Sequence, residues 1–145
     1  PIRSVRDKKY KYIWNPMHKR FFVNFNNIGN RLNCWQSWLR DAEINPEAAE
    51  IVRRWVKRPE VEFYDTEKDP YELKNLAKDP VYAELMKRMK KKLESWMAQQ
   101  GDLGVETELS SPQSSKEKQW QPRLEKYYNA NREAYQRIFK GLNKE

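Results

Sequence analysis

The feature that most constrains the fold is an amphipathic segment at residues 80–100, with a helix start signal before it and a stop signal after it. Asp79 is a good N-cap residue, and Pro80 follows at the first helical position, where its missing N–H breaks no helical hydrogen bond. Gly101 stands where a helix C-terminus favours a left-handed residue. Apolar side chains repeat along one face of the segment: Tyr82, Leu85, Met86, Met89, Leu93, Trp96 and Met97. We expect this stripe to be buried against a second element of structure.

Alternating side chains near the N-terminus predict strands on which that helix can pack. Residues 9–14 place aromatic rings on one face and mainly lysines on the other. The aromatic face consists of Tyr10, Tyr12 and Trp14. Residues 2–6 precede a short polar turn and complete a hairpin, and Pro16 ends the second strand because proline lacks the N–H of the ladder. Alternation also permits a strand at 21–25 and predicts one at 61–65.

Two helices are predicted between residues 33 and 57. The first has an apolar face of Trp35, Trp38, Leu39 and Ala42. Asn45 can cap the second helix, with Pro46 at its first position. Its apolar face contains Ile51, Val52 and Trp55. We interpret Trp35 and Trp38 as core residues, with a platform for stacking sugars as the alternative.

The C-terminal third changes in character. Residues 102–121 are rich in serine, with glycine and proline, which is typical of a linker, and a last helix is predicted from Pro122. The elements together predict an α+β fold, in which a small antiparallel sheet of three to four strands is packed by a long amphipathic helix, with additional helices. We divide the chain into a domain at 1–104, a linker at 105–121 and a helical extension at 122–145.

Composition limits the classes of function. The 145 residues suit one domain, and 13% aromatic residues argue against disorder despite a mean hydropathy of −1.13. No stretch approaches the roughly 18 apolar residues of a membrane span. A single cysteine, Cys34, excludes an internal disulfide and a multi-cysteine zinc site, and a single histidine, His18, excludes His-pair metal motifs. Because the chain begins with Pro1, we expect a processed or excised piece of a longer protein.

The net charge of +8 favours anionic partners without specifying which. The basic run Lys87–Lys92 lies outside the apolar stripe, so we interpret it as a solvated helix face, with a surface for polyanions as the alternative. A basic loop follows the second strand, where Arg20 offers a planar donor fork and Lys19 a point charge. A substrate rim that contacts an anionic ligand is predicted from Asn15, His18, Lys19 and Arg20. A merely exposed loop histidine is the alternative for His18.

Other reactive side chains are interpreted as structural. Cys34 has no base near it in the sequence and is expected to be a buried thiol. The carboxylates of residues 65–72 crowd a turn, and they lack the glycine and the terminal Glu of a calcium loop. No phosphate-binding glycine-rich loop occurs, so we expect no complete active site in this chain.

Two segments resemble motifs of the sulfatase family. Ile2–Ile13 resembles the R-x-V-R-x-x-x-Y-K-Y/L-I hairpin near the C-terminus of sulfatases. Glu62–Ala77 resembles their E-L-Y-D-x-x-x-D-P-x-E-x-x-N-L-A turn, and the helix that ends in Trp96 and then Gly101-Asp102 also fits. The resemblance covers roughly residues 1–104 and is closest to the N-sulfoglucosamine sulfohydrolase branch with its bacterial relatives.

The resemblance implies a C-terminal subdomain that packs on a large α/β domain carrying a formylglycine and a calcium ion. The catalytic C/S-x-P-x-R motif is missing, since Cys34 is followed by Trp-Gln-Ser-Trp and Ser110–Ser114 has Ser where Arg is required. We therefore expect no catalytic, cofactor-binding or metal-binding residue in this chain, and expect calcium and formylglycine in the parent. The implied function is that of a non-catalytic part of a sulfuric ester or sulfamate hydrolase. Its partners would be the N-terminal catalytic domain and, through it, sulfated carbohydrate such as glycosaminoglycan.

The resemblance also implies scaffold roles for the turn after residue 61. These roles fall to Tyr64, Asp65, Asp69, Pro70, Leu73, Asn75 and Leu76, with the tyrosine and leucines packing and Asp65 and Asn75 forming turn hydrogen bonds. Separated from its partner domain, the chain would expose an apolar face and self-associate. The family location would be periplasmic, secreted or lysosomal, without membrane insertion. The alternative function is a basic module that binds polyanions or nucleic acid and has no enzymatic parent, although nucleic acid is not the partner we expect.

Overall fold

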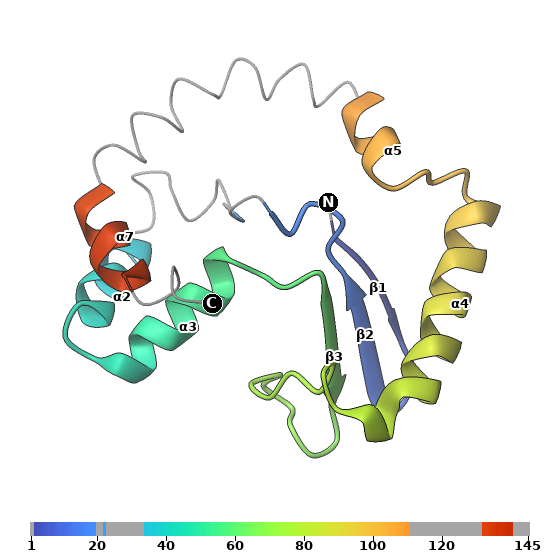
Figure 1. Cartoon of the computed structure of the whole chain (residues 1–145), viewed down its shortest axis with the longest axis horizontal. Helices are drawn as coiled ribbons and strands as arrows, with labels where there is room; N and C mark the ends of the chain where they lie inside the picture. The colour runs from blue at the N-terminus through green and yellow to red at the C-terminus, as the bar shows by residue number, and fades with distance from the viewer. Residues whose placement is uncertain (1, 20–21, 23–33, 111–131, 141–145) are drawn as a thin grey trace. The chain divides into compact units, whose positions relative to one another are not determined.

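The computed structural model describes residues 2–19, 22, 34–110 and 132–140, and the chain divides into two compact units (Figure 1). The first, which we call the sheet unit, consists of Pro1–His18 and Pro59–Ser111. The second, which we call the helical unit, consists of Lys19–Arg58 and Pro112–Glu145. Each unit is therefore built from two separate stretches of sequence.

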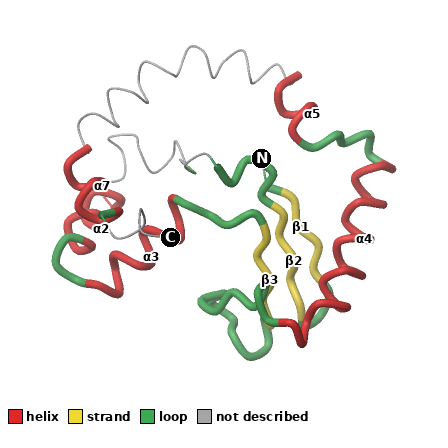
Figure 2. Tube along the Cα trace, in the orientation of Figure 1, coloured by secondary structure: helices red, strands yellow, loops and turns green. Residues whose placement is uncertain are grey.

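Three strands form the antiparallel sheet, in the order β1 (Arg3–Arg6), β2 (Tyr10–Trp14) and β3 (Val61–Asp65) (Figure 2). The β1–β2 turn is closed by the Asp7 side chain, whose Oδ1 accepts from the N–H groups of Tyr10 (2.6 Å) and Lys9 (2.9 Å). These hydrogen bonds lower the pKa of the Asp7 carboxyl below its usual value. The predicted hairpin and the predicted strand at 61–65 are confirmed, and so is the α+β fold class.

The long helix begins later than predicted. Asp79 Oδ1 accepts a hydrogen bond from the Val81 N–H (3.0 Å), but the residues that follow it form a 3-10 turn, η1 (Pro80–Tyr82). The α-helix α4 then runs over Ala83–Gln99. Short 3-10 turns are common at helix N-termini, which explains the delay. Gly101 has a φ of 65° after the helix, as its predicted role as a stop signal requires.

Aromatic and methionine side chains fill the core between the sheet and α4. Its buried members are Tyr12, Phe63, Met89, Leu93 and Met97. The Tyr10 ring stacks on the Phe63 ring, with the centroids 5.5 Å apart. The prediction that Trp96 belongs to the buried stripe is wrong, because its side chain is 52% exposed. Met89, Leu93 and Met97 are the buried side chains of α4. At about 100° per residue, Trp96 lies at the edge of the face that they form.

The helical unit contains α2 (Cys34–Ala42), α3 (Pro46–Val56) and α7 (Arg132–Phe139). Its buried core consists of Trp35, Leu39, Ala42, Ala49, Val52, Val56 and Ile138. The predicted cap is confirmed, since Asn45 Oδ1 accepts from the N–H groups of Glu47 (3.0 Å) and Ala48 (3.3 Å). Residues that are far apart in the sequence thus share one apolar core.

Three sequence interpretations in the helical unit are wrong. Trp38 is 46% exposed and Ile51 is 49% exposed, so neither is a core residue. Cys34 is an exposed thiol rather than a buried one. Trp38 lies at the edge of the α2 face that Trp35 and Leu39 define, with its ring centroid 5.9 Å from that of Trp35.

Some expectations concern residues outside the described ranges. Of the strand permitted at 21–25, only Phe22 is described. The first part of the helix predicted from Pro122, residues 122–131, also lies outside the described ranges. Of the segment predicted as a linker, residues 105–110 are described and form the short helix α5 (Val105–Ser110). The division into three segments stays a prediction. Within the described ranges, every helix is too short or too polar to cross a membrane.

Candidate functional site

A buried polar cluster fixes the chain where β2 ends and the predicted rim loop begins. Asn15 is only 3% exposed, and its Nδ2 donates to the Pro59 carbonyl (2.6 Å) and to Glu62 Oε1 (2.7 Å). The other oxygen of the Glu62 carboxylate accepts from the Tyr64 hydroxyl at 2.6 Å. The Asn15 N–H also donates to the Glu60 carbonyl (2.8 Å), which extends the β2–β3 pairing. Because buried polar groups need partners, this cluster ties the root of the loop to β3.

The four residues of the predicted rim differ in their surroundings. Asn15 is buried in the cluster just described. His18 is partly buried, with its N–H donating to the Asn15 carbonyl (3.1 Å) and its ring Nδ1 at 3.3 Å from the same oxygen. Lys19 is exposed, and Arg20 lies outside the described residues. A role of these residues at a substrate rim stays a prediction.

Two aspartates organise the turn that follows β3. Asp65 is buried, and its Oδ1 accepts from the N–H groups of Lys68 (3.1 Å) and Glu67 (3.2 Å). Asp69 Oδ2 accepts from the Lys74 N–H at 2.7 Å. Short carboxylates stabilise turns in this way because they replace the backbone acceptor that a tight turn lacks. The turn role predicted for Asp65 agrees with these contacts.

Asn75 binds the end of this turn to the outer edge of β3. Its Oδ1 accepts from the N–H groups of Phe63 (2.9 Å) and Ala77 (3.0 Å), and its Nδ2 donates to the Val61 carbonyl (3.2 Å). The Leu76 N–H donates to the Phe63 carbonyl at 2.8 Å. A single side chain therefore satisfies edge groups that a further strand would otherwise pair.

The remaining motif residues divide between core and surface. Tyr64 is buried, and Leu76 packs against the core of the sheet unit. Pro70 is exposed, and so is Leu73, which makes the packing role predicted for Leu73 wrong. The neighbouring Glu72 instead attaches the loop to β2, because both oxygens of its carboxylate accept from Lys11 Nζ, at 2.8 and 2.9 Å. This ion pair helps to hold Glu72 at a φ of 55°, a left-handed conformation that residues other than glycine seldom adopt.

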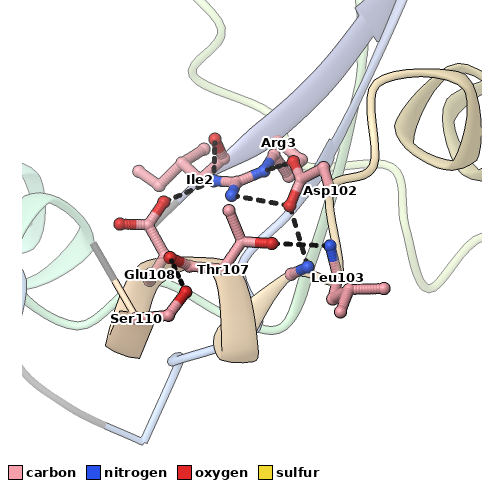
Figure 3. Close-up of polar contacts among 8 residues, drawn as sticks. Ile2, Arg3, Asp102, Leu103, Thr107, Glu108 and Ser110 are labelled. Atoms are coloured by element: carbon pink, nitrogen blue, oxygen red, sulfur yellow. Dashed lines mark hydrogen bonds and ion pairs between the residues drawn. The ribbon is translucent and has the colours of Figure 1, made fainter.

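A second polar cluster, which the sequence did not predict, joins β1 to the segment after α4 (Figure 3). Arg3 donates to both oxygens of Asp102, with an Nη2–Oδ1 distance of 3.0 Å, and its Nη1 lies 2.9 Å from Glu108 Oε1. Asp102 Oδ1 also accepts from the Gly104 N–H (2.8 Å). The hydrogen bonds from Arg3 lower the pKa of the Asp102 carboxyl below its usual value. The fork geometry clamps the end of α4 to the first strand.

The described part of the chain contains no group of side chains that could bind a metal ion. Among residues 2–19, 22, 34–110 and 132–140, no three His, Cys, Asp or Glu side chains are grouped so that they could hold a metal ion. Cys34 lies on the surface of the helical unit, without the sequence context that a formylglycine requires. The residues described thus fit neither calcium nor formylglycine, and we derive no catalytic step through either group.

Comparisons with known proteins identify the family. Residues 36–99 match the model of the family described as N-sulphoglucosamine sulphohydrolase, C-terminal. Two ulvan-active sulfatases of Formosa agariphila are similar to the chain: one is 35% identical over 104 residues, which is 70% of this chain and 17% of the relative. The other is 32% identical over 116 residues, which is 77% of this chain and 20% of the relative.

Human N-sulphoglucosamine sulphohydrolase is 29% identical over 130 residues, which is 78% of this chain and 24% of the human protein. The chain thus spans only 17% to 24% of the length of these relatives. The matched segment includes β3, the turn that Asp65 and Asn75 organise, and α4. The chain therefore belongs to the sulfatase family, as a C-terminal domain of the N-sulphoglucosamine sulphohydrolase type.

Proposed function

We propose that this chain is the non-catalytic C-terminal part of a sulfatase that hydrolyses sulfate esters or sulfamates. The observation that carries the proposal is the match of residues 36–99 to a C-terminal family model. The partner is the N-terminal catalytic domain of the same parent, which would supply the nucleophile and the calcium site. The contribution of this chain is then to complete the fold, through a sheet whose edge and loop root are fixed by side-chain hydrogen bonds.

The proposed substrate of the complete protein is a sulfated carbohydrate. The relatives are named for activity on ulvan and on N-sulphoglucosamine. A net charge of +8 on this chain favours anionic ligands of that class, although charge alone does not choose among them. Sulfated glycosaminoglycans are the first substrates to test.

The test compares the complete protein with this chain expressed alone. Sulfate release is measured with an aryl sulfate, a sulfated glycosaminoglycan and a glucosamine N-sulfate. We expect turnover of at least one of them by the complete protein and none by this chain. Sulfate release by the isolated chain, or no release from any of the three by the complete protein, would overturn the proposal.

The rim role of the 15–20 loop is tested in the complete protein by Lys19→Ala and Arg20→Ala. We expect each variant to raise KM by about two- to fivefold with kcat unchanged, as for the loss of one charged contact with the substrate. Asn15→Ala is the comparison variant, because its buried amide bonds to Glu62 and Pro59, and it should lower the melting temperature instead. An unchanged KM in both cationic variants removes the loop from the rim.

A further inference from the structure

The outer flank of α4 carries a row of exposed side chains that completing the fold does not explain. Arg88, Lys92 and Trp96 follow one another at intervals of four residues, so they lie above one another on the helix surface. Successive members are separated by about 6 Å along the axis, since a helix rises about 1.5 Å per residue. All three side chains are exposed. The buried stripe faces the sheet, and this row lies beside it.

The two cations of the row have no hydrogen-bond or ion-pair partner among the described residues. The helix carries five cations and two carboxylates, and one of those carboxylates, Glu94, lies 3.7 Å from Lys90 on the other flank. Arg88 and Lys92 form no hydrogen bond or ion pair within 4 Å with any described residue. The other carboxylate, Glu84, precedes Arg88 by four residues and so lies at the start of the same row. Lys92 also lowers the pKa of Asp7, but that carboxylate is held by backbone N–H groups of its own turn. With two cations against Glu84, the flank keeps a net positive charge.

The exposed indole of Trp96 adds a flat apolar surface at the end of the row. At 52% exposure it leaves open a ring face that a core residue would bury. Indole attracts polarised C–H groups through the negative face of its π-system, so it suits the apolar face of a sugar ring. Arg88 offers a planar fork for two oxygens of a sulfate group, and Lys92 offers a point charge. One helix flank thus combines the two chemistries of a sulfated sugar chain.

We propose that Arg88, Lys92 and Trp96 form a binding site for a sulfated polysaccharide along α4. The cations pair with sulfate groups on successive sugars, and the indole stacks on a sugar ring. The inference rests on the proposed function for its ligand class. It adds that this domain holds the polymer directly, in addition to completing the fold of the enzyme.

The experiment uses the complete protein and the variants Arg88→Ala/Lys92→Ala and Trp96→Ala. The matched control for the first is Lys87→Ala/Lys90→Ala, which removes the same charge from the other flank of the same helix. Tyr71→Ala controls for the loss of an exposed aromatic ring outside the row. Retention on immobilised heparin is measured in rising salt, and KM is measured for a sulfated polysaccharide and for an aryl sulfate. We expect the row variants to elute at lower salt than their controls. Their KM for the polymer should rise about fivefold, with the aryl sulfate kinetics unchanged.

Equal loss of retention in Arg88→Ala/Lys92→Ala and in its control would overturn the site, because net charge would then explain the binding. Unchanged retention of Trp96→Ala, or a larger loss for duplex DNA or anionic vesicles than for the polysaccharide, would also overturn it. If the complete protein releases no sulfate from any substrate, the proposed function fails. The retention difference between row and control variants still decides whether the row binds the polymer, so the two failures are distinguishable.

Discussion

The sheet unit and the helical unit are each assembled from two stretches of sequence, yet different interactions join their elements. In the sheet unit, side-chain hydrogen bonds of Asn15, Asn75 and Arg3 connect strands, turns and the end of α4. In the helical unit, the described helices meet through an apolar core, with an ion pair between Arg137 and Glu43 at its surface. Helices satisfy their own backbone groups, whereas the outer strand of a sheet does not. A three-stranded sheet therefore needs polar side chains to close its edges.

The largest expected effects come from emptying the two cores. Phe63 is fully buried in the sheet unit and Leu39 nearly so in the helical unit. Phe63→Ala should lower the free energy of unfolding by about 3–5 kcal/mol and Leu39→Ala by about 2–5 kcal/mol, since each leaves a cavity. Denaturant titration gives the sizes, and amide exchange shows which unit loses protection. A loss below about 1 kcal/mol for either variant contradicts its core assignment.

The buried cluster of the sheet unit supplies the next largest effect. Tyr64→Phe removes the hydroxyl that donates to Glu62, and so takes one hydrogen bond from a buried carboxylate. We expect a loss of about 1.5–3 kcal/mol, the range for hydrogen bonds to charged groups. Tyr71→Phe is the matched control because that side chain is exposed, and it should leave stability unchanged. Equal unfolding curves for the two variants would mean that the cluster does not stabilise the sheet unit.

The Arg3–Asp102 clamp makes the free energy of unfolding depend on pH. The pKa of Asp102 is lowered in the folded state, so its contribution is present above the unfolded value of about 4 and is lost as pH falls through the lower folded value. Asp102→Asn should cost about 1 kcal/mol at pH 7 and show a smaller further loss on acidification than the wild type. Unfolding at pH 7 and pH 3 measures both, with Asp41→Asn as control. A variant that keeps the full acid sensitivity would show that the clamp is not its source.

The smallest effects concern helix starts, which can be compared between the units. Asn45→Ala removes a cap that accepts from two N–H groups, and we expect a loss of about 1 kcal/mol. Asp79→Ala removes a cap that accepts from one N–H group of a 3-10 turn, so a loss of about 0.5 kcal/mol is expected. Asn45→Ser and Asp79→Ser should each restore most of the loss. The reverse order of the two alanine variants would contradict the comparison.

Local signals in the sequence predicted most of the secondary structure. The capping residues Asn45 and Asp79, the stop at Gly101 and the alternation at 61–65 each depend on neighbours a few residues away. Exposure was harder to predict at the edges of helix faces. Trp96 satisfies the same spacing rule as Met97, but a face only about 100° wide is buried, and its borders depend on the partner surface.

The polar clusters combine contacts that a local motif signals with contacts that only the fold creates. Turn contacts of Asp65 and Asn75 lie within one motif and could be anticipated. The pairing of Arg3 with Asp102 joins residues 99 positions apart, and no local pattern signals it. The rim role of Asn15 stays a prediction, but its contact with Glu62 follows from the β2–β3 register and has no local signal in the sequence. A tight turn fixes the register of a hairpin, but β2 and β3 are separated by α2 and α3, so no local turn sets their pairing.

The two-stretch assembly of the helical unit has a consequence for synthesis. Arg53 of α3 donates to the carbonyl of Ile138, a residue 85 positions later, whose side chain completes the core around Leu39. At about 5–20 residues per second, a ribosome makes that residue some 4–17 seconds after α3. The described elements of the sheet unit are all present once residue 110 has emerged, so that unit can close first. During this interval α2 and α3 can pack on each other, but the apolar surface that Ile138 and Phe139 later cover lacks the contact with α7.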